Sequence, residues 1–338
     1  MVLRLIFQRL IGAIPNVLGV VIVTFLLTRA LPGDPAAYFA GPSASQEAIE
    51  QIRRSLGLDK SLVHQFVFYL QDLLRGDLGQ SLSTGQPVLT EIASRLPASI
   101  ELALCGLLLA CAVAIPLGVA AATRPGTWLD HCCRVLVTTG ISLPTFFTGL
   151  LLAYVFYFLL GVAPSPVGRL DVTFIAPPTI TGFYLIDSLI DADAPTFVAS
   201  ASQLILPALT MALFVMAPLM RMTRASMLSV LSADYIRTAR ASGLSANTVL
   251  YVYAFRNALL PILTTLGMVF SFLLGSSVLV EKVFAWPGIG SYVIEALVAS
   301  DYAPVQGFVL TMALVYVLLN LMIDILYGVI DPRMRIDA

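Results

Sequence analysis

The chain has 338 residues, of which 58% are hydrophobic and 12% are charged, and its mean hydropathy is +0.91. Soluble domains carry about 25% charged residues, so this composition excludes an ordinary soluble globular protein. The net charge is −1 and the pI is about 6.1, and no extended basic stripe is present, which excludes a nucleic-acid-binding protein.

Six charge-free runs exceed the length of about 18 residues that is typical of a membrane-spanning helix. They are Leu10–Thr28, Leu102–Thr123, Val135–Gly168, Ala194–Met220, Asn257–Val280 and Tyr302–Ile323. The first run is too long for a signal peptide and lacks the small-residue cleavage site, so we interpret it as an anchor. The sequence therefore predicts an all-α polytopic membrane protein with six transmembrane helices.

The distribution of charges predicts which side each segment faces. Arg4 and Arg9 precede the first run, which predicts a cytoplasmic N-terminus. The segments then predicted to be cytoplasmic carry 11 of the 19 basic residues and four of the 20 acidic ones; they are residues 1–9, 123–134, 221–256 and 330–338. The outer segments carry 8 basic and 14 acidic residues, and Glu101 and Asp324 remain in or near the membrane. Because cytoplasmic loops are enriched in basic residues, both termini are predicted to be cytoplasmic.

Residues 33–96 are predicted to form a small helical cap on the outer face. Ser45 precedes a helical segment that ends at Gly57, and a second segment has apolar residues three and four apart and ends at Gly76. The apolar positions of the second segment are Leu62, Phe66, Tyr69, Leu70, Leu73 and Leu74. We expect this stripe to pack on the protein's own membrane helices rather than to lie among lipid headgroups.

Prolines and loop composition shape the middle of the chain. The third run is too long for one straight helix, and Pro144 should kink it. Residues 165–200 should form an outer loop rich in proline and aspartate. Residues 281–292, after the fifth span, are too polar to cross a membrane, so we interpret them as a re-entrant or interfacial hairpin with Trp286 as its anchor.

A basic loop, residues 222–261, interrupts the apolar chain with several arginines and one acid, Asp234. Asp234 can cap a short helix, and Gly243 can take the left-handed turn that ends it. Ser245 can then cap a second helix that runs to Asn257. Two short helices joined at a glycine corner and tied to spans on both sides form a rigid lever; the alternative is an ordinary solvated loop.

Several polar residues lie within the predicted spans. The candidates for a translocation path are Ser142, Pro144, Thr145, Thr264, Thr265 and Ser271. Small polar residues in membrane helices more often serve close packing, so packing is the competing interpretation for each of them. Asp324 lies four residues after Asn320 near the cytoplasmic end of the last span. An intramembrane acid is a candidate functional group, but we favour a structural pairing for it.

The motifs that mark enzymes are missing from the sequence. It contains no phosphate-binding GxxxxGK[ST] loop and no GxSxG, HExxH or CxxC pattern, which indicates that the chain is not an enzyme and does not itself bind ATP. Asp130, His131, Cys132 and Cys133 are adjacent, but neighbouring cysteines do not easily bind one tetrahedral ion, so we predict no metal site. The four cysteines lie in or beside spans and imply no disulfide framework.

Two segments of the basic loop resemble the cytoplasmic coupling loop of ABC-importer permease subunits: DYIRTARASG (234–243) and FRNALLP (255–261). Further similar segments follow in order along the whole chain: LPGDPA (31–36), GDLGQSL (76–82), RLPASIEL (95–102), ISLPTFFTG (141–149), ITGFYLID (180–187), LPALTM (206–211), RMTRASML (221–228), SSVLVEKVFAWPGIG (276–290) and DILYGVIDPRMR (324–335). The likeness is to the dipeptide, oligopeptide and nickel family, and within it to dipeptide permease subunits that are the first of a permease pair.

The resemblance implies the type I ABC-importer permease fold and ATP-driven import of di- or oligopeptides across the bacterial inner membrane. It divides the chain into a cytoplasmic N-terminus and first span (1–32), an extracytoplasmic cap (33–96) and a five-helix core (97–338) with a coupling loop at 222–257. The implied partners are a second homologous permease subunit, two ATPase subunits that bind ATP and Mg, an extracytoplasmic solute-binding protein and membrane lipid. No cofactor is expected in this chain, and no nucleic acid.

The resemblance also implies which residues of the loop couple to the ATPase: Arg221, Arg224, Asp234, Tyr235, Arg237, Thr238, Ala239, Arg240, Ala241 and Gly243. In this account the small residues let the helix enter a cleft of the partner, and Arg237 and Arg240 pair with acids of the partner.

Two alternatives remain open. The same importer class takes other cargo, such as nickel chelates, glutathione or opines. A proton-coupled secondary transporter with Asp324 as its relay is a different class. The single buried acid, the lack of a charged chain across the membrane and the lack of a visible inverted repeat count against it.

Overall fold

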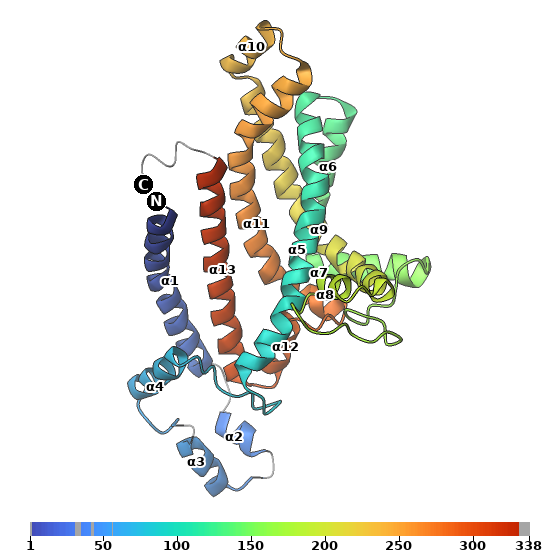
Figure 1. Cartoon of the computed structure of the whole chain (residues 1–338). Coiled ribbons are helices and arrows are strands. Elements are labelled where there is room, and N and C mark those ends of the chain that lie inside the picture. Colours follow the sequence, from blue (N-terminus) through green and yellow to red (C-terminus); the bar gives the residue numbers. More distant parts are fainter. Residues whose placement is uncertain (1, 31–34, 42–43, 56, 331–338) are drawn as a thin grey trace. The chain divides into compact units, whose positions relative to one another are not determined.

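The computed structural model describes residues 2–30, 35–41, 44–55 and 57–330 (Figure 1). Within these ranges the only β-type pairing is an isolated bridge between Gln80 and Pro87, so the predicted all-α class is confirmed for them. The elements are α1 (Val2–Ala30), α2 (Pro35–Ala40), α3 (Gln46–Ser55), α4 (Leu62–Leu74), α5 (Val88–Thr123), α6 (Trp128–Ser142), α7 (Thr145–Leu152), η1 (Ala153–Leu159), α8 (Tyr184–Ile190), α9 (Ala194–Leu231), α10 (Asp234–Ala241), η2 (Thr248–Phe255), α11 (Arg256–Val283), α12 (Ile289–Val298) and α13 (Tyr302–Ile330). Most of the LPGDPA segment and the C-terminal residues 331–338 lie outside the described residues.

The helices form two compact units. The first, which we call the α9 unit, contains residues 98–286 and 319–330. The second, which we call the α12 unit, contains residues 3–97 and 287–318. α5 and α13 each supply one part of their length to either unit.

Four helices among the described residues are long and apolar enough to cross a membrane. They are α5, α9, the continuous helix Thr248–Val283 formed by η2 and α11, and α13 as far as Ile325. They correspond to the predicted second, fourth, fifth and sixth spans. α1 contains the predicted first span, and the apolar part of it in which side chains are described, Ile11–Leu26, is shorter.

The third predicted span is broken rather than kinked. α6 ends at Ser142, Leu143 is extended with a ψ of 135°, and α7 begins at Thr145 after Pro144 as its N-cap residue. Proline lacks a backbone N–H and disfavours helical geometry in the residue before it, which explains the interruption. The second half continues through η1 and ends at Gly161, whose φ of +63° lies in the left-handed region.

Residues 165–200 are more ordered than the plain loop predicted from the sequence, because they contain α8 and the first turns of α9. The buried carboxylate of Asp187 organises the turn before α8. It accepts hydrogen bonds from the backbone N–H groups of Thr181 (2.8 Å) and Gly182 (2.9 Å) and from the Thr181 hydroxyl (2.7 Å). A carboxylate with this many donors is saturated, so its burial is tolerated and the turn is fixed.

α9 is the central helix of its unit and packs against α6, α7, α8 and α11. Glycines permit the close approach of α5. A Cβ added at Gly106 would lie 2.9 Å from the Cβ of Met211, and one at Gly118 would lie 2.7 Å from the Cβ of Thr223.

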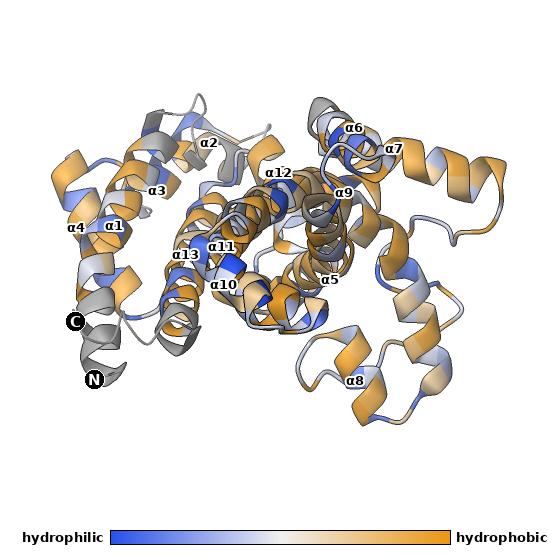
Figure 2. Cartoon of the chain, turned by 90° about the horizontal axis from the view of Figure 1, so that it is seen from above, coloured by the Kyte–Doolittle hydropathy of each residue, from blue (hydrophilic) through white to orange (hydrophobic). Residues whose placement is uncertain are grey.

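The helices α7 and η1, coloured as hydrophobic in Figure 2, carry large apolar side chains that are exposed in this chain, such as Phe158 at 71%. Such a surface suits a lipid or protein environment and not water.

A buried ion pair and a buried tryptophan fix the end of the α9 unit at which α8 lies. Arg169 donates from Nη2 to Oε2 of Glu101 at 2.6 Å and to the carbonyl of Gly182 at 2.8 Å. Trp286 is 2% exposed, and its Nε1 donates to the carbonyl of Ala98 at 2.9 Å. The prediction that Trp286 anchors residues 281–292 at a membrane interface is therefore wrong, and the re-entrant alternative for this segment stays a prediction. A buried indole whose N–H is satisfied within the protein is a core residue.

In the α12 unit, α4 packs on α1 through aromatic rings. The ring of Phe25 lies 5.1 Å from that of Phe66 and 5.8 Å from that of Tyr69, between centroids. The predicted packing of the apolar stripe on the protein is thus confirmed at its centre. It is wrong at its two ends, where Leu62 is 56% exposed and Leu74 is 81% exposed.

The start of α5 forms the other core of the α12 unit. α5 begins at Val88, well before the predicted span, and Val88 and Ile92 pack with Ile289 and Tyr292 of α12. Asp301, which is fully buried, accepts a hydrogen bond from the Ser81 hydroxyl at 2.7 Å and so holds the turn before α5 against the loop before α13.

The glycine contact between α5 and α9 gives a stability prediction. Gly118→Ala should destabilise the protein by roughly 1–3 kcal/mol, because the added methyl group meets the Thr223 side chain and the neighbouring backbone. Gly275→Ala is the matched control, since a Cβ there meets no atom within 4 Å. Thermal unfolding of the purified protein in detergent measures both variants. Equal midpoints for the two would contradict the packing described for Gly118.

Candidate functional site

The basic loop forms a short helix and a corner beyond the ends of α9 and α11, as the α9 unit in Figure 1 shows. α10 begins at Asp234, but the residue in the N-cap position is Ala233, with an extended ψ of 149°. The prediction that Asp234 caps the helix is therefore wrong by one position. Asp234 instead forms an exposed pair with Arg237 at 3.5 Å, an interaction that contributes little to stability.

Gly243 makes the predicted corner. Its φ is +78°, its N–H donates to the carbonyl of Arg240 at 3.0 Å, and the next N–H, that of Leu244, donates to Ala239 at 3.4 Å. These two bonds form the Schellman motif, in which a glycine in the left-handed region ends a helix. The prediction for Gly243 is confirmed.

The segment after the corner is stiffer than predicted. Ser245 caps it as expected, because its Oγ accepts a hydrogen bond from the Thr248 N–H at 3.2 Å. The helix does not end at Asn257, however, and η2 continues into α11 without interruption. The Asn257 side chain donates to the carbonyl of Tyr253 at 2.6 Å, one turn earlier, which holds the helix together instead of ending it. The corner therefore joins α10 directly to a predicted span.

The two faces of α10 have different environments. Ile236 and Ala239 are buried, at 0% and 6% exposure, in a hydrophobic cluster with Met227 of α9 and with Val249 and Ala254 of η2. Ala239 thus packs on the chain's own core and does not face outward, whereas the entry of α10 into a partner's cleft stays a prediction. The opposite face is open to a partner; its exposed residues are Asp234, Tyr235, Arg237, Thr238, Arg240 and Ala241.

An ion pair that was not foreseen ties α6 to α9 beneath this loop. Arg224 donates from Nε to Oδ1 of Asp130 at 2.6 Å and from Nη2 to Oδ2 at 2.9 Å, and the Gly126 N–H donates to Oδ2 at 3.0 Å. Arg134 lies 3.8 Å from the same carboxylate. Arg224 is therefore engaged within the chain, whereas Arg221 is exposed. The sequence offered one local indication of this ion pair, which is that Asp130 is the single acid of residues 123–134.

The Arg224 guanidinium and the Gly126 N–H lower the pKa of Asp130 from 3.8 to about 2. The pair therefore stabilises the fold above about pH 4 and loses that contribution as the pH falls toward 2, so it is intact at neutral pH. The same pairing removes Asp130 as a metal ligand. Among the described residues, no group of three or more His, Cys, Asp and Glu side chains is arranged to hold a metal ion.

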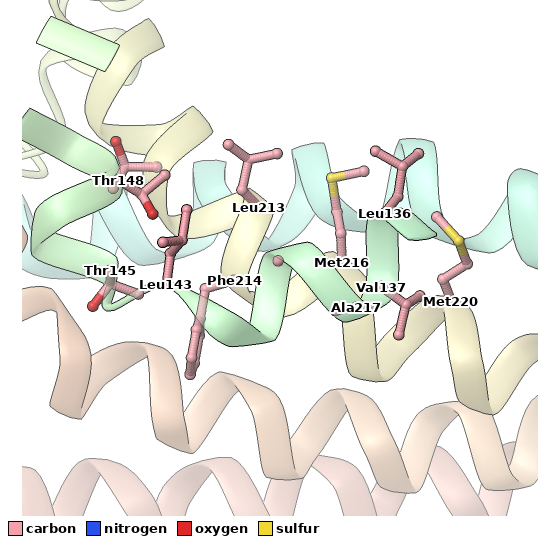
Figure 3. A pocket seen from close by; sticks show the side chains of 12 residues that line it. Leu136, Val137, Leu143, Thr145, Thr148, Leu213, Phe214, Met216, Ala217 and Met220 are labelled. Atoms are coloured by element: carbon pink, nitrogen blue, oxygen red, sulfur yellow. The ribbon is translucent and has the colours of Figure 1, made fainter. Parts of the chain in front are cut away.

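The residues predicted to line a translocation path fall into two groups, one at the break in the third predicted span and one on α11. Thr145 lines a cavity of about 160 Å³ between α6, α7 and α9, at the break that Pro144 makes in the third predicted span. Figure 3 shows Thr145 and Thr148 at one end of this cavity and Met220 at the other, with mostly apolar side chains between them. The cavity thus has a few hydroxyl groups in an apolar wall. The side chain of Ser142 lies outside the described residues.

The candidates on α11 do not line this cavity. The hydroxyls of Thr264, Thr265 and Ser271 donate to the carbonyls of Leu260, Pro261 and Gly267, each one turn earlier on the same helix. That geometry agrees with the packing interpretation of these residues. Asp324 is half-buried on α13.

The sequence matches a known protein family over nearly its whole length. Residues 114–336 match the family described as the binding-protein-dependent transport system inner membrane component, and residues 2–103 match its N-terminal membrane component family. The chain belongs to this family. It is a transport permease component of the inner membrane and not a catalytic subunit.

Curated relatives match the permease over nearly its full length. It is 46% identical over 327 residues to the probable D,D-dipeptide transport system permease protein DdpB of Escherichia coli (strain K12), with 96% of each chain covered. It is 40% identical over 335 residues to the dipeptide transport system permease protein DppB of the same strain, with 98% and 99% covered. It is 41% identical over 338 residues to the di/tripeptide transport system permease protein DppB of Pseudomonas aeruginosa (strain UCBPP-PA14), with 98% and 99% covered. The resemblance stated from the sequence motifs is confirmed.

The pair between Asp130 and Arg224 gives a second stability prediction. Asp130→Ala should destabilise the permease by roughly 3–5 kcal/mol, because it leaves the half-buried Arg224 guanidinium without its carboxylate. Asp234→Ala removes the other acid of this end, whose pair is exposed, and should cost less than about 1 kcal/mol. Thermal unfolding compares the two variants. A loss as small for Asp130→Ala as for Asp234→Ala would show that the pair does not hold α6 to α9.

Proposed function

We propose that this permease imports di- or oligopeptides and transmits the movement of partner ATPases through α10. The observation that carries the substrate class is the identity of 40–46% over at least 96% of the chain to relatives named as dipeptide or di/tripeptide permeases. The three relatives named above are all dipeptide or di/tripeptide permeases, which favours peptides over nickel chelates, glutathione or opines and a permease over a proton-coupled carrier.

The proposed complex contains this chain, a second homologous permease, two ATPase subunits and an extracytoplasmic solute-binding protein. The family name, which specifies a binding-protein-dependent system, supports such an assembly. We further propose six spans of the type I importer fold with both termini in the cytoplasm, a cap in residues 33–96 on the outer face and the coupling loop 222–257 on the inner face. Seven basic and two acidic residues in segments 123–134 and 221–256 favour that orientation.

The geometry of α10 supports its proposed role in coupling. Its inner face is packed into the permease, while Tyr235, Arg237 and Arg240 point away from that core and remain available to acidic or aromatic groups of a partner. Because Gly243 and Ser245 join α10 to the continuous helix of η2 and α11, a force on α10 acts directly on a membrane-spanning segment. ATP-driven closure of two ATPase subunits would then move two such levers together. We place the translocation path beside Pro144 and Thr145, where the third span is broken.

The test of this function is purification of the tagged permease with its co-expressed neighbours, followed by uptake into proteoliposomes with ATP inside. We expect two ATPase subunits and a second permease to copurify, and L-alanyl-L-alanine or D-alanyl-D-alanine to accumulate only with ATP and the binding protein. Use of both stereoisomers tells a D,D-dipeptide system from a general dipeptide system. ATP-independent uptake that Asp324→Asn abolishes would instead support the proton-coupled carrier.

A substitution at the corner tests the lever itself. Gly243→Val should leave the complex assembled and ATP hydrolysis active but lower peptide uptake per ATP about tenfold. A β-branched residue in the left-handed region costs about 1–2 kcal/mol, enough to shift the corner out of its geometry. Gly243→Asn is the control, because asparagine tolerates this region and a Cβ at Gly243 meets no atom within 4 Å. Undiminished uptake by a normally expressed Gly243→Val permease would refute the lever.

A further inference from the structure

An apolar groove of about 410 Å³ runs between the last turns of α5 and η2 in the α9 unit. Its walls include Ile115, Pro116 and Ala120 on α5 and Leu250 and Tyr251 on η2. Pro116 and Ala120 lie four residues apart and therefore share one face of α5, where their small side chains leave the space open. No segment of the described chain fills the groove.

The floor of this groove is the hydrophobic cluster that supports α10. Ile115 and Leu250 line the groove and also pack against the buried cluster that contains Ile236 and Ala239. An occupant would therefore rest against the same side chains that hold the inner face of α10 in place.

The groove begins at the level expected for lipid headgroups. Arg124, which lines its end, is the first charged residue after the predicted second span. Trp128, four residues later, is 80% exposed, and Tyr251 is 58% exposed. Exposed tryptophan and tyrosine near the end of a span are typical of the membrane interface. From Arg124 to Ile115 the helix rises about 13 Å, so the groove reaches from that interface into the hydrocarbon region.

The charge at the mouth of the groove favours an anion. Arg124 is exposed, and within the part of the chain that the structure describes its guanidinium forms no ion pair or hydrogen bond. Of the two acids in the surrounding segments, Asp130 is buried under Arg224 and Asp234 pairs with Arg237. Neither acid is available to neutralise Arg124, and a basic residue near an anionic membrane surface attracts anionic lipids by about 1 kcal/mol.

We propose that the groove binds one anionic phospholipid of the cytoplasmic leaflet, with an acyl chain along the apolar walls and the phosphate on Arg124. A lipid fits because the site is apolar along its length and basic only at its end. An extended polypeptide segment would bring backbone N–H and C=O groups into apolar walls that offer them no partner, and an apolar helix, which satisfies its own backbone, would bring no negative charge to Arg124. The proposal uses the orientation given under "Proposed function" only to name the leaflet, and it concerns lipid binding rather than transport.

Native mass spectrometry of the complete copurified complex tests the site. After delipidation, the complex is titrated with phosphatidylglycerol and, separately, with phosphatidylcholine. Wild type should retain phosphatidylglycerol preferentially, and Arg124→Gln should lower that retention about fivefold, the factor expected for one basic residue near an anionic surface. Arg124→Lys should restore most of it. Glycerol 3-phosphate without acyl chains should not compete, which separates a lipid from a soluble phosphate.

Two matched pairs of variants distinguish lipid binding in the groove from a general effect of charge or side-chain size. Arg221→Gln removes an exposed arginine of the same end outside the groove and should leave retention unchanged. Ala120→Leu fills the groove and should lower retention, whereas Ala225→Leu, at an exposed position outside it, should not. Equal loss from Arg124→Gln and Arg221→Gln, or equal binding of the two lipids, would overturn the proposal.

A photocrosslinker tests the identity of the occupant directly. Tyr251, on the wall of the groove, is replaced by p-benzoylphenylalanine in the full complex in native membranes. We expect crosslinked products that carry phospholipid. A crosslink to another subunit would mean that protein, and not lipid, fills the groove. This readout does not depend on uptake. The lipid proposal can therefore be refuted while the proposed peptide transport stands, and the transport proposal can be refuted while the lipid proposal stands.

Discussion

The buried carboxylate of Asp130 holds the basic end of this permease together. It joins α6 to α9 through Arg224, a residue 94 positions away in the sequence. Burying a charge is costly unless its partners satisfy it, and here a two-pronged guanidinium and a backbone N–H do so. The hydrophobic cluster beside this pair can then fix the orientation of α10, with Ile236 inward and the arginines outward.

In this arrangement α10 is connected to a long helix at each of its two ends. α10 is attached on one side to α9, of 38 residues, and on the other to a helix from Thr248 to Val283, of 36 residues. These helices span about 55 Å each and pack against each other. Gly243 is fixed by two backbone hydrogen bonds instead of acting as a loose hinge. In the coupling that we propose, a movement of α10 would therefore pass to both helices instead of being absorbed at the corner.

Local signals in the sequence were sufficient for part of this structure. Gly57, Gly76 and Gly243 end their segments with positive φ, and Ser245 caps the next helix, because these effects depend on a few neighbouring residues. Pairings across long sequence distances left no local trace. Hydropathy could assign Arg224 to a basic loop and Trp286 to an interface, but it could not show that Asp130 and the Ala98 carbonyl satisfy them.

The break at Pro144 was underestimated for a related reason, and it bears on where we propose the translocation path. Hydropathy counts side chains, whereas a helix break exposes backbone groups. The last carbonyls of α6 lose their helical partners where the chain becomes extended at Leu143. The hydroxyls of Thr264 and Ser271, by contrast, are already bonded to their own helix. Irregular backbone at membrane depth is tolerated only inside protein or beside a cavity, and a cavity lies at this break. In the path that we propose, a polar solute would meet its hydrogen-bonding groups at the break in the third span and not along α11.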